Sequence, residues 1–197
     1  MTQAPSGRIV VLVNGLPASG KTTLARGLAR RLRLPLFSKD VIKEAHADVF
    51  GALPPDGRPQ RAWNQLFGAA ANDTMWNLLA DSACGAVLES TWPAHETWAF
   101  AQAGLESAQV ERPLQIWCQV SLALARERYA LRHPSRHPVH GDQPPEAEWE
   151  QRWARAAPLP IPGTLHVDTA GPVDLAAIAD WACRMSQAGA SGPTGTG

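Results

Sequence analysis

The chain has 197 residues, a length that fits one domain with a substantial buried core. Its 18 basic and 18 acidic residues cancel, so its bulk charge attracts neither nucleic acid nor an anionic membrane. Cys84, Cys118 and Cys183 form no CxxC pair, which argues against a disulfide framework or a zinc site and favours reduced thiols in a cytoplasm. The sequence shows no signal peptide and no apolar run of membrane-spanning length. We therefore expect a cytoplasmic protein that does not associate with membranes.

A phosphate-binding motif follows the first predicted strand. Residues 9–13 form a β-branched apolar run that is typical of a buried parallel strand, expected over about residues 8–14. Leucines at 24, 28 and 32 then recur at helical spacing, and this helix is expected to end before Pro35. The segment between strand and helix matches the pattern G-x-x-x-x-G-K-[ST] at every fixed position; it consists of Gly15, Leu16, Pro17, Ala18, Ser19, Gly20, Lys21 and Thr22, and Thr23 follows it.

The chemistry of this loop predicts the binding of ATP and Mg²⁺. Its glycines let successive backbone N–H groups point at phosphate oxygens, and the helix N-terminus behind them adds partial positive charge. Lys21 is expected to reach the β- and γ-phosphates. The hydroxyl of Thr22 is expected to be a ligand of Mg²⁺.

The rest of the chain alternates between short apolar strands and helices. Strands are expected at about residues 34–37, 86–90, 114–120 and 164–168, and helices after Ser38-Lys39-Asp40 and over about 60–83, 95–106, 122–132, 146–156 and 173–186. Gly85 is expected to close the helix that ends near residue 83. The last helix is expected to bury Met185 with its other apolar residues.

This alternation predicts an α/β protein with a P-loop NTPase fold. A five-stranded parallel sheet should lie between helices in a three-layer α/β/α arrangement. Residues 1–7 are expected to form a tail, residues 8–186 the domain with a lid at about 122–145, and residues 187–197 a disordered tail. Because ligands of such folds lie beyond the carboxyl ends of the strands, Asp40 and Glu89 are candidate site residues.

Several segments together resemble a known group of enzymes. They are residues 15–23, the Phe37-Ser-Lys-Asp-Val-Ile-Lys43 segment, the Val87-Leu-Glu-Ser-Thr91 segment and the arginine-rich stretch 126–136. The chain resembles the small P-loop kinases, AAA-type ATP-binding proteins that include the polynucleotide 5′-hydroxyl kinase domain, chloramphenicol phosphotransferase and gluconate kinase. The resemblance covers most of residues 8–185 and names no substrate.

This resemblance assigns roles to individual residues. Asp40 matches the aspartate beside the acceptor hydroxyl, although the paired acids of some relatives are absent, so it acts either as the base or only to orient the acceptor. Glu89 lies where relatives usually carry an aspartate that orients Mg²⁺. Arg128 and Arg132, with Arg126 and Arg136 nearby, match lid arginines that stabilise the transferred phosphoryl group. Adenine is expected near residues 168–171.

The residues themselves leave plainer alternatives open. Asp40 could only cap its helix, and Glu89 could be a buried acid satisfied by Ser90 or Thr91. Lys43 could contact an anionic acceptor or be solvated. His133, His137 and His140 fit loop histidines better than zinc ligands. The tryptophans near the expected acceptor cleft, at positions 63, 76, 92 and 98, fit core packing better than stacking on an acceptor.

The leading functional hypothesis is an ATP- and Mg²⁺-dependent kinase that phosphorylates a hydroxyl of a small molecule. A nucleoside or nucleotide, a sugar acid and an antibiotic all remain candidates, whereas a neutral chain without an extended basic run disfavours a polynucleotide. The alternative is a regulatory or binding module that holds a nucleotide without transferring phosphate; the absence of N-K-x-D disfavours a signalling GTPase. Either a monomer or a homodimer fits the sequence.

Overall fold

The computed structural model describes residues 8–55, 57–141 and 144–188 and confirms the predicted α/β fold. The strands are β1 (Ile9–Gly15), β2 (Leu36–Ser38), β3 (Gly85–Glu89), β4 (Leu114–Gln119) and β5 (Gly163–Asp168). The helices are α1 (Lys21–Leu32), α2 (Lys39–Phe50), α3 (Gln60–Asp81), α4 (Ala94–Ser107), α5 (Leu122–Arg132), α6 (Glu146–Ala154) and α7 (Leu175–Gln187), with 3₁₀ turns η1 (His133–Ser135) and η2 (Pro138–His140).

All five strands are parallel, in the order β2-β3-β1-β4-β5. The strand that leads into the phosphate-binding loop is therefore the central one, as the resemblance implies. Val11 of β1 pairs with Val87 on one side and with Leu114 on the other. Every residue of β1 is buried, which explains why it reads as a continuous apolar run rather than an alternating one.

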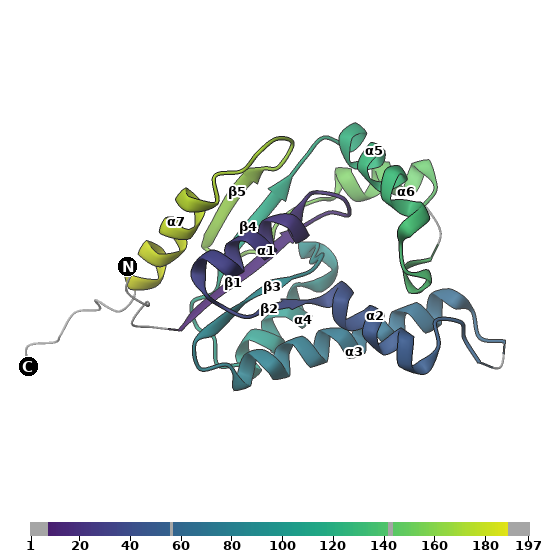
Figure 1. Ribbon diagram of the computed structural model, residues 1–197, viewed down its shortest axis with the longest axis horizontal. Helices are drawn as coiled ribbons and strands as arrows, with labels where there is room; N and C mark the ends of the chain where they lie inside the picture. Colours follow the sequence, from purple (N-terminus) through teal and green to yellow (C-terminus); the bar gives the residue numbers. More distant parts are fainter. Residues whose placement is uncertain (1–7, 56, 142–143, 189–197) are drawn as a thin grey trace, which may run out of the picture.

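Helices cover both faces of the sheet (Figure 1). Ile9, Val11 and Val13 pack on the side of α1 and α7. Val10 and Leu12 point to the opposite side, where they pack with residues of α3 and α4. The alternation of side chains along one strand thus builds two separate cores and gives the three expected layers. Figure 1 shows α5 and α6 beyond the carboxyl end of β4.

Three details differ from the expectations. Gly85 does not close α3, which ends at Asp81, but begins β3 with φ +87°; a Cβ there would lie 1.9 Å from the carbonyl oxygen of Ile9, so backbone crowding requires glycine. Met185, in the last turn of α7, is exposed, whereas Trp181 one turn earlier packs against the core. Gln187, the first residue of the expected tail, still belongs to α7.

The expected tails otherwise lie outside the described residues. No helix in the part of the chain that the structure describes is long and apolar enough to cross a bilayer. Trp76 and Trp92 are buried and pack on each other with ring centroids 6.0 Å apart, so these two indoles belong to the core. Cys118 is also a core residue, and burial raises the pKa of its thiol to about 12.

Candidate active site

The loop between β1 and α1 has the backbone of a phosphate cradle. Gly20 and Ala18 have positive φ values of 81° and 62°, which curl the chain after β1. At Gly15 a Cβ would lie 2.5 Å from the Ser19 hydroxyl and 2.8 Å from the Cys118 carbonyl oxygen, so the loop has room only for glycine. The Ser19 hydroxyl is buried without a partner in the described structure. A bound phosphate would supply the acceptor that this hydroxyl lacks, so the loop fits the group.

A fully buried amide fixes the start of this loop. The Asn14 carbonyl oxygen accepts hydrogen bonds from the backbone N–H of Gly15 at 2.7 Å and of Trp92 at 2.9 Å. Its Nδ2 donates to the Trp92 carbonyl at 2.8 Å and to Gln115 Oε1 at 3.1 Å. One side chain thus ties the phosphate loop to β4 and to the chain after β3, with both of its polar atoms satisfied.

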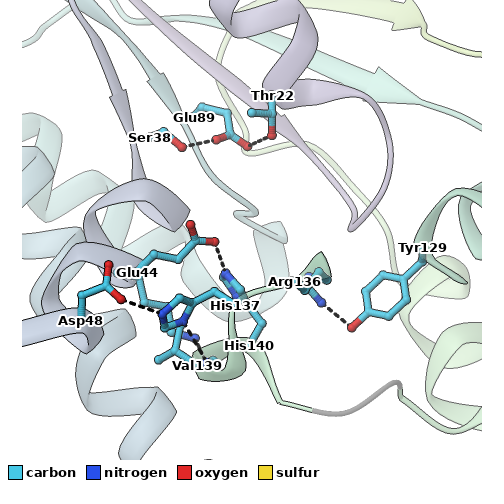
Figure 2. A network of polar contacts seen from close by, with 11 residues as sticks. Thr22, Ser38, Glu44, Asp48, Glu89, Tyr129, Arg136, His137, Val139 and His140 are labelled. Carbon is cyan, nitrogen blue, oxygen red and sulfur yellow. Dashed lines mark hydrogen bonds and ion pairs between the residues drawn. The ribbon is translucent and has the colours of Figure 1, made fainter. Parts of the chain in front are cut away.

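The residues expected to hold Mg²⁺ come together beneath the loop (Figure 2). Glu89 is 1% exposed; its carboxylate accepts from the Thr22 hydroxyl at 3.1 Å and from the Ser38 hydroxyl at 2.6 Å. Lys21 Nζ lies 4.0 Å from the same carboxylate. Its partners are therefore Thr22 and Ser38 rather than the expected alternatives Ser90 or Thr91. A hydroxyl and a carboxylate are hard oxygen donors that suit Mg²⁺. This ion takes few protein ligands and completes its coordination shell with water and phosphate oxygens.

Asp40 lies in the first turn of α2, but Ser38 is the N-cap residue of that helix. Asp40 is exposed at the surface, next in sequence to Lys39, which lines an open cleft. Desolvation by the surrounding protein opposes ionisation, but the positive charges of Lys21, His140 and Lys39 outweigh it and lower the pKa of Asp40. Asp40 is thus kept ionised, mainly by the positive charge of Lys21 in the phosphate loop.

Arg128 and Arg132 line a hollow on one side of the phosphate loop, together with Gly20, Thr23 and Gly171. The Arg128 guanidinium donates to the carbonyl oxygens of Thr169 at 3.1 Å and Ala170 at 2.9 Å. The expected adenine segment 168–171 and the two lid arginines therefore border the same hollow. Arg126 lies apart from it, in an exposed ion pair with Glu146.

The loop after α5 is held against α2 by several polar contacts (Figure 2). His140 contacts Glu44 at 2.7 Å, and His137 contacts Asp48 at 3.1 Å. Lys43 donates to the Val139 carbonyl at 3.0 Å, so it binds the lid loop rather than standing free in solvent. The histidines thus serve as loop contacts, and no group of three metal-ligating side chains occurs within residues 8–55, 57–141 and 144–188.

Arg136 lines a different hollow from Arg128. It donates to the Tyr129 hydroxyl, its guanidinium lies 4.8 Å from the centroid of that ring, and its charge contributes to the lowered pKa of Asp40. It borders an open cleft of about 840 Å³ that also contacts Pro17 of the phosphate loop. Two separate hollows therefore border the phosphate loop: one includes residues of the expected adenine segment, and the other is lined by Lys39, the neighbour of Asp40 in the sequence.

Comparison with known proteins assigns this arrangement to a family. The profile of the AAA domain family matches residues 10–159, the part that carries the phosphate loop, Asp40, Glu89 and the lid. The chain belongs to the AAA domain family. No curated protein matches the sequence of this AAA domain protein.

Solved structures agree with the AAA domain assignment. A candidate kinase from Chloroflexus aurantiacus j-10-fl is 33% identical, with 93% of this chain and 99% of that chain covered and a TM-score of 0.77. A gluconokinase from Sinorhizobium meliloti 1021 shares the fold at 18% identity and TM-score 0.55, covering 95% of this chain and 94% of that one. A shikimate kinase from Acinetobacter baumannii in complex with shikimate is 18% identical with TM-score 0.53, covering 93% and 94%. The resemblance to small P-loop kinases is confirmed.

Sequence reasoning missed several residues of the site in this AAA domain protein. Ser38 binds Glu89 directly, and Lys39 lines the acceptor-side cleft with a pKa lowered by burial and by Lys21. Arg61 and Asn72 of α3 line the same cleft. A signal for the α3 residues existed, because small and polar residues recur at helical spacing in a helix that is otherwise apolar toward the core.

Proposed function

We propose that this protein is an ATP- and Mg²⁺-dependent kinase that transfers the γ-phosphoryl group to a hydroxyl of a small molecule. The observation that carries the proposal is the pair of separate hollows that both border the phosphate loop. A phosphotransferase needs room for two substrates around one phosphate loop, whereas a nucleotide-binding module needs room for one. The similarity to the candidate kinase from Chloroflexus aurantiacus j-10-fl supports the same class.

The nucleotide would lie with its phosphates in the loop and its base beside Arg128 and the 168–171 segment. Lys21 would bind the β- and γ-phosphates, and Thr22 with Glu89 would hold Mg²⁺. When bound, the metal bridges phosphate oxygens and neutralises their charge. The acceptor would lie in the cleft that Lys39 and Arg136 border, next to Asp40.

In the proposed reaction the acceptor oxygen bonds to the γ-phosphorus while the bond to the bridging oxygen breaks and ADP leaves. Asp40 accepts a hydrogen bond from the acceptor hydroxyl and aligns it. Because the pKa of Asp40 is lowered, its carboxylate is a weak base at neutral pH, and the hydroxyl proton moves late, toward Asp40 and then to solvent. The low pKa thus favours an orienting role over early deprotonation.

A comparison of wild type with Asp40→Asn tests this function. Both would be incubated with ATP, Mg²⁺ and a pool of nucleosides, sugar acids, neutral polyols and hydroxylated antibiotics, with phosphorylated products read by mass spectrometry. We expect kcat to fall by about 10²–10⁴-fold in Asp40→Asn with ATP affinity within about twofold of wild type. Asp180→Asn, an exposed change on α7, is the matched control and should retain full turnover.

The alternative is a nucleotide-binding regulatory module. It predicts ATP binding without transfer to any acceptor, and indifference to Asp40→Asn. Both hypotheses require the loop to bind the phosphates of ATP, and Lys21→Ala tests this requirement. ATP affinity or turnover must fall in this variant if the loop binds phosphate. Equal turnover by wild type and Asp40→Asn would remove Asp40 from the mechanism.

A further inference from the structure

One face of α3 forms a wall of the acceptor-side cleft. Its cleft-lining residues are polar or small, and they are Gln60, Arg61, Asn64, Gln65, Gly68, Ala69 and Asn72. Positions 61, 65, 68 and 72 follow helical spacing, so they lie along one face. Four buried residues of α3, Phe67, Met75, Trp76 and Leu79, pack into the apolar cores instead, and Ala71 is buried as well. The helix therefore has a core face and a polar cleft face.

Gly68 opens a hollow in the middle of this wall. Glycine inside a helix is destabilising relative to alanine. Nothing in the backbone requires it here, because an added Cβ would meet nothing closer than Lys39 Cε at 3.9 Å. No packing contact therefore explains a glycine at this position. Its missing side chain leaves space beside Lys39, whose Nζ would lie 4.0 Å from a Cβ at residue 68.

Two amide side chains of α3 also line this cleft, those of Asn64 and Asn72. Asn72 Oδ1 is buried and has no hydrogen-bond partner in the described structure, which is unfavourable until a donor binds to it. Asn64 Oδ1 accepts a hydrogen bond from Gln60 at 2.8 Å, which orients the amide so that its Nδ2 can donate to a ligand. An acceptor oxygen and a donor nitrogen two turns apart suit the hydroxyl groups of a polyol.

The charges of the cleft are unbalanced toward positive. Its basic residues are Lys39, Lys43, Arg61, Arg136 and Arg152, and its acids are Glu96 and Glu148. Arg152 is paired with Glu148, and Lys43 is engaged by the lid loop. Lys39, Arg61 and Arg136 form no ion pair with any residue that the structure describes. Since the whole chain is neutral, this concentration of positive charge is local to the cleft.

We propose that the acceptor is a small polyhydroxylated anion, a polyol that carries a carboxylate or a phosphate group. Arg61 and Lys39 bind its anionic group, and Asn64 and Asn72 bind its hydroxyls beside the hollow at Gly68. Burial and the charge of Lys21 lower the pKa of Lys39, so they disfavour its charged form. A bound anion would stabilise that charged form. The inference rests on the proposed kinase function for its reaction, but the anion site itself does not depend on transfer.

Matched acceptors test the class. Purified full-length protein with ATP and Mg²⁺ would be assayed with gluconate, glucitol 6-phosphate and neutral glucitol, which share chain length and differ in charge. We expect kcat/KM for one of the two anions to exceed that for glucitol by at least about tenfold. Preference for gluconate or for glucitol 6-phosphate identifies a carboxylate or a phosphate as the group bound.

Arg61→Gln tests the site, with Arg31→Gln on the exposed face of α1 as the charge-matched control. We expect Arg61→Gln to raise KM for the preferred anion at least about tenfold, with kcat within about threefold and KM for ATP unchanged. Arg31→Gln should behave as wild type. A neutral acceptor used as well as the anions, or unchanged KM in Arg61→Gln, would overturn the anion inference and leave the kinase function standing.

A binding measurement separates the two proposals if nothing is phosphorylated. Calorimetry would use a non-hydrolysable ATP analogue and Mg²⁺ to fill the phosphate loop, with gluconate and inorganic phosphate as probes. Anion binding that is lost in Arg61→Gln and kept in Arg31→Gln supports the site while the proposed function fails. No anion binding at millimolar concentration, or binding that Arg61→Gln leaves intact, overturns the inference.

Discussion

Replacing Asn14 with alanine removes the one side chain that joins the phosphate loop to β4 and to the segment after β3. Four hydrogen bonds are lost, to the N–H of Gly15, the N–H and carbonyl of Trp92, and Gln115 Oε1. At about 1 kcal/mol for each bond, the free energy of unfolding should fall by about 4 kcal/mol. Gln115 Oε1 keeps the Leu159 N–H at 3.1 Å, so this partner is not left unsatisfied.

A loss of this size is a large part of the roughly 5–15 kcal/mol that a domain of this kind has. Urea unfolding followed by circular dichroism measures it directly, and the melting temperature should fall by about 8–16 °C. ATP affinity should fall as well, because the Gly15 amide and the loop after it lose their anchor. Asn77→Ala, an exposed change on α3, is the control and should stay within about 0.5 kcal/mol of wild type. A loss below about 1 kcal/mol in Asn14→Ala would refute the reasoning.

Three further predictions concern other parts of the molecule. Gly68→Ala should raise the free energy of unfolding by about 0.5–1 kcal/mol in a urea melt, because the new Cβ makes only an ordinary contact with Lys39, while it narrows the acceptor hollow and raises acceptor KM; a destabilised variant would contradict this. Burial lowers the pKa of His140, aided by Arg136 and Lys43 and opposed by Asp40 and Glu44. The unfolded chain therefore binds the proton more readily, so the stability that His140 contributes is complete above about pH 6.5 and is lost as pH falls toward the folded-state pKa. Unfolding measured from pH 7.5 to 5.0 should show this loss in wild type relative to His140→Gln, and parallel curves would exclude it. Finally, an alkylating reagent at pH 8 should label the exposed Cys84 and leave Cys118 unmodified, since the pKa of that buried thiol is raised to about 12; peptide mass spectrometry would detect either outcome.

The sequence predicted the sheet and the position of the loop between β1 and α1 because both depend on local patterns. The motif from Gly15 to Thr22 needs a particular backbone, and buried parallel strands need continuous apolar runs such as residues 9–13. Glu89 was found for a similar reason, since it ends a strand next to β1 in the sheet. The role of Gly85 was predicted wrongly because glycine is favoured both after a helix and at the start of a strand that another backbone approaches closely. Only the position of the Ile9 carbonyl, which the sequence does not reveal, distinguishes the two roles.

The acceptor side could not be predicted in the same way because it is assembled from distant segments. Ser38 meets Glu89 across 51 positions, and Lys43 meets Val139 across 96. Arg136 reaches the cleft while Arg128, on the same stretch of chain, turns to Thr169, and sequence spacing does not separate the two. These outcomes depend on how the lid loop packs on α2, which no local pattern specifies.

The two sides of the site therefore have different structural supports. The phosphate loop is anchored to the centre of the sheet through Asn14 and β1, whereas the acceptor wall consists of α3, α2 and the lid loop that His140 and Lys43 join to α2. Ser38 is where they meet, because it ends the short strand β2, begins α2 and binds Glu89. A change on the cleft face of α3 should alter which acceptor reacts without altering how the nucleotide is held. A change at Ser38 should disturb both, because it moves Asp40 relative to the Glu89 carboxylate, which we propose to hold Mg²⁺.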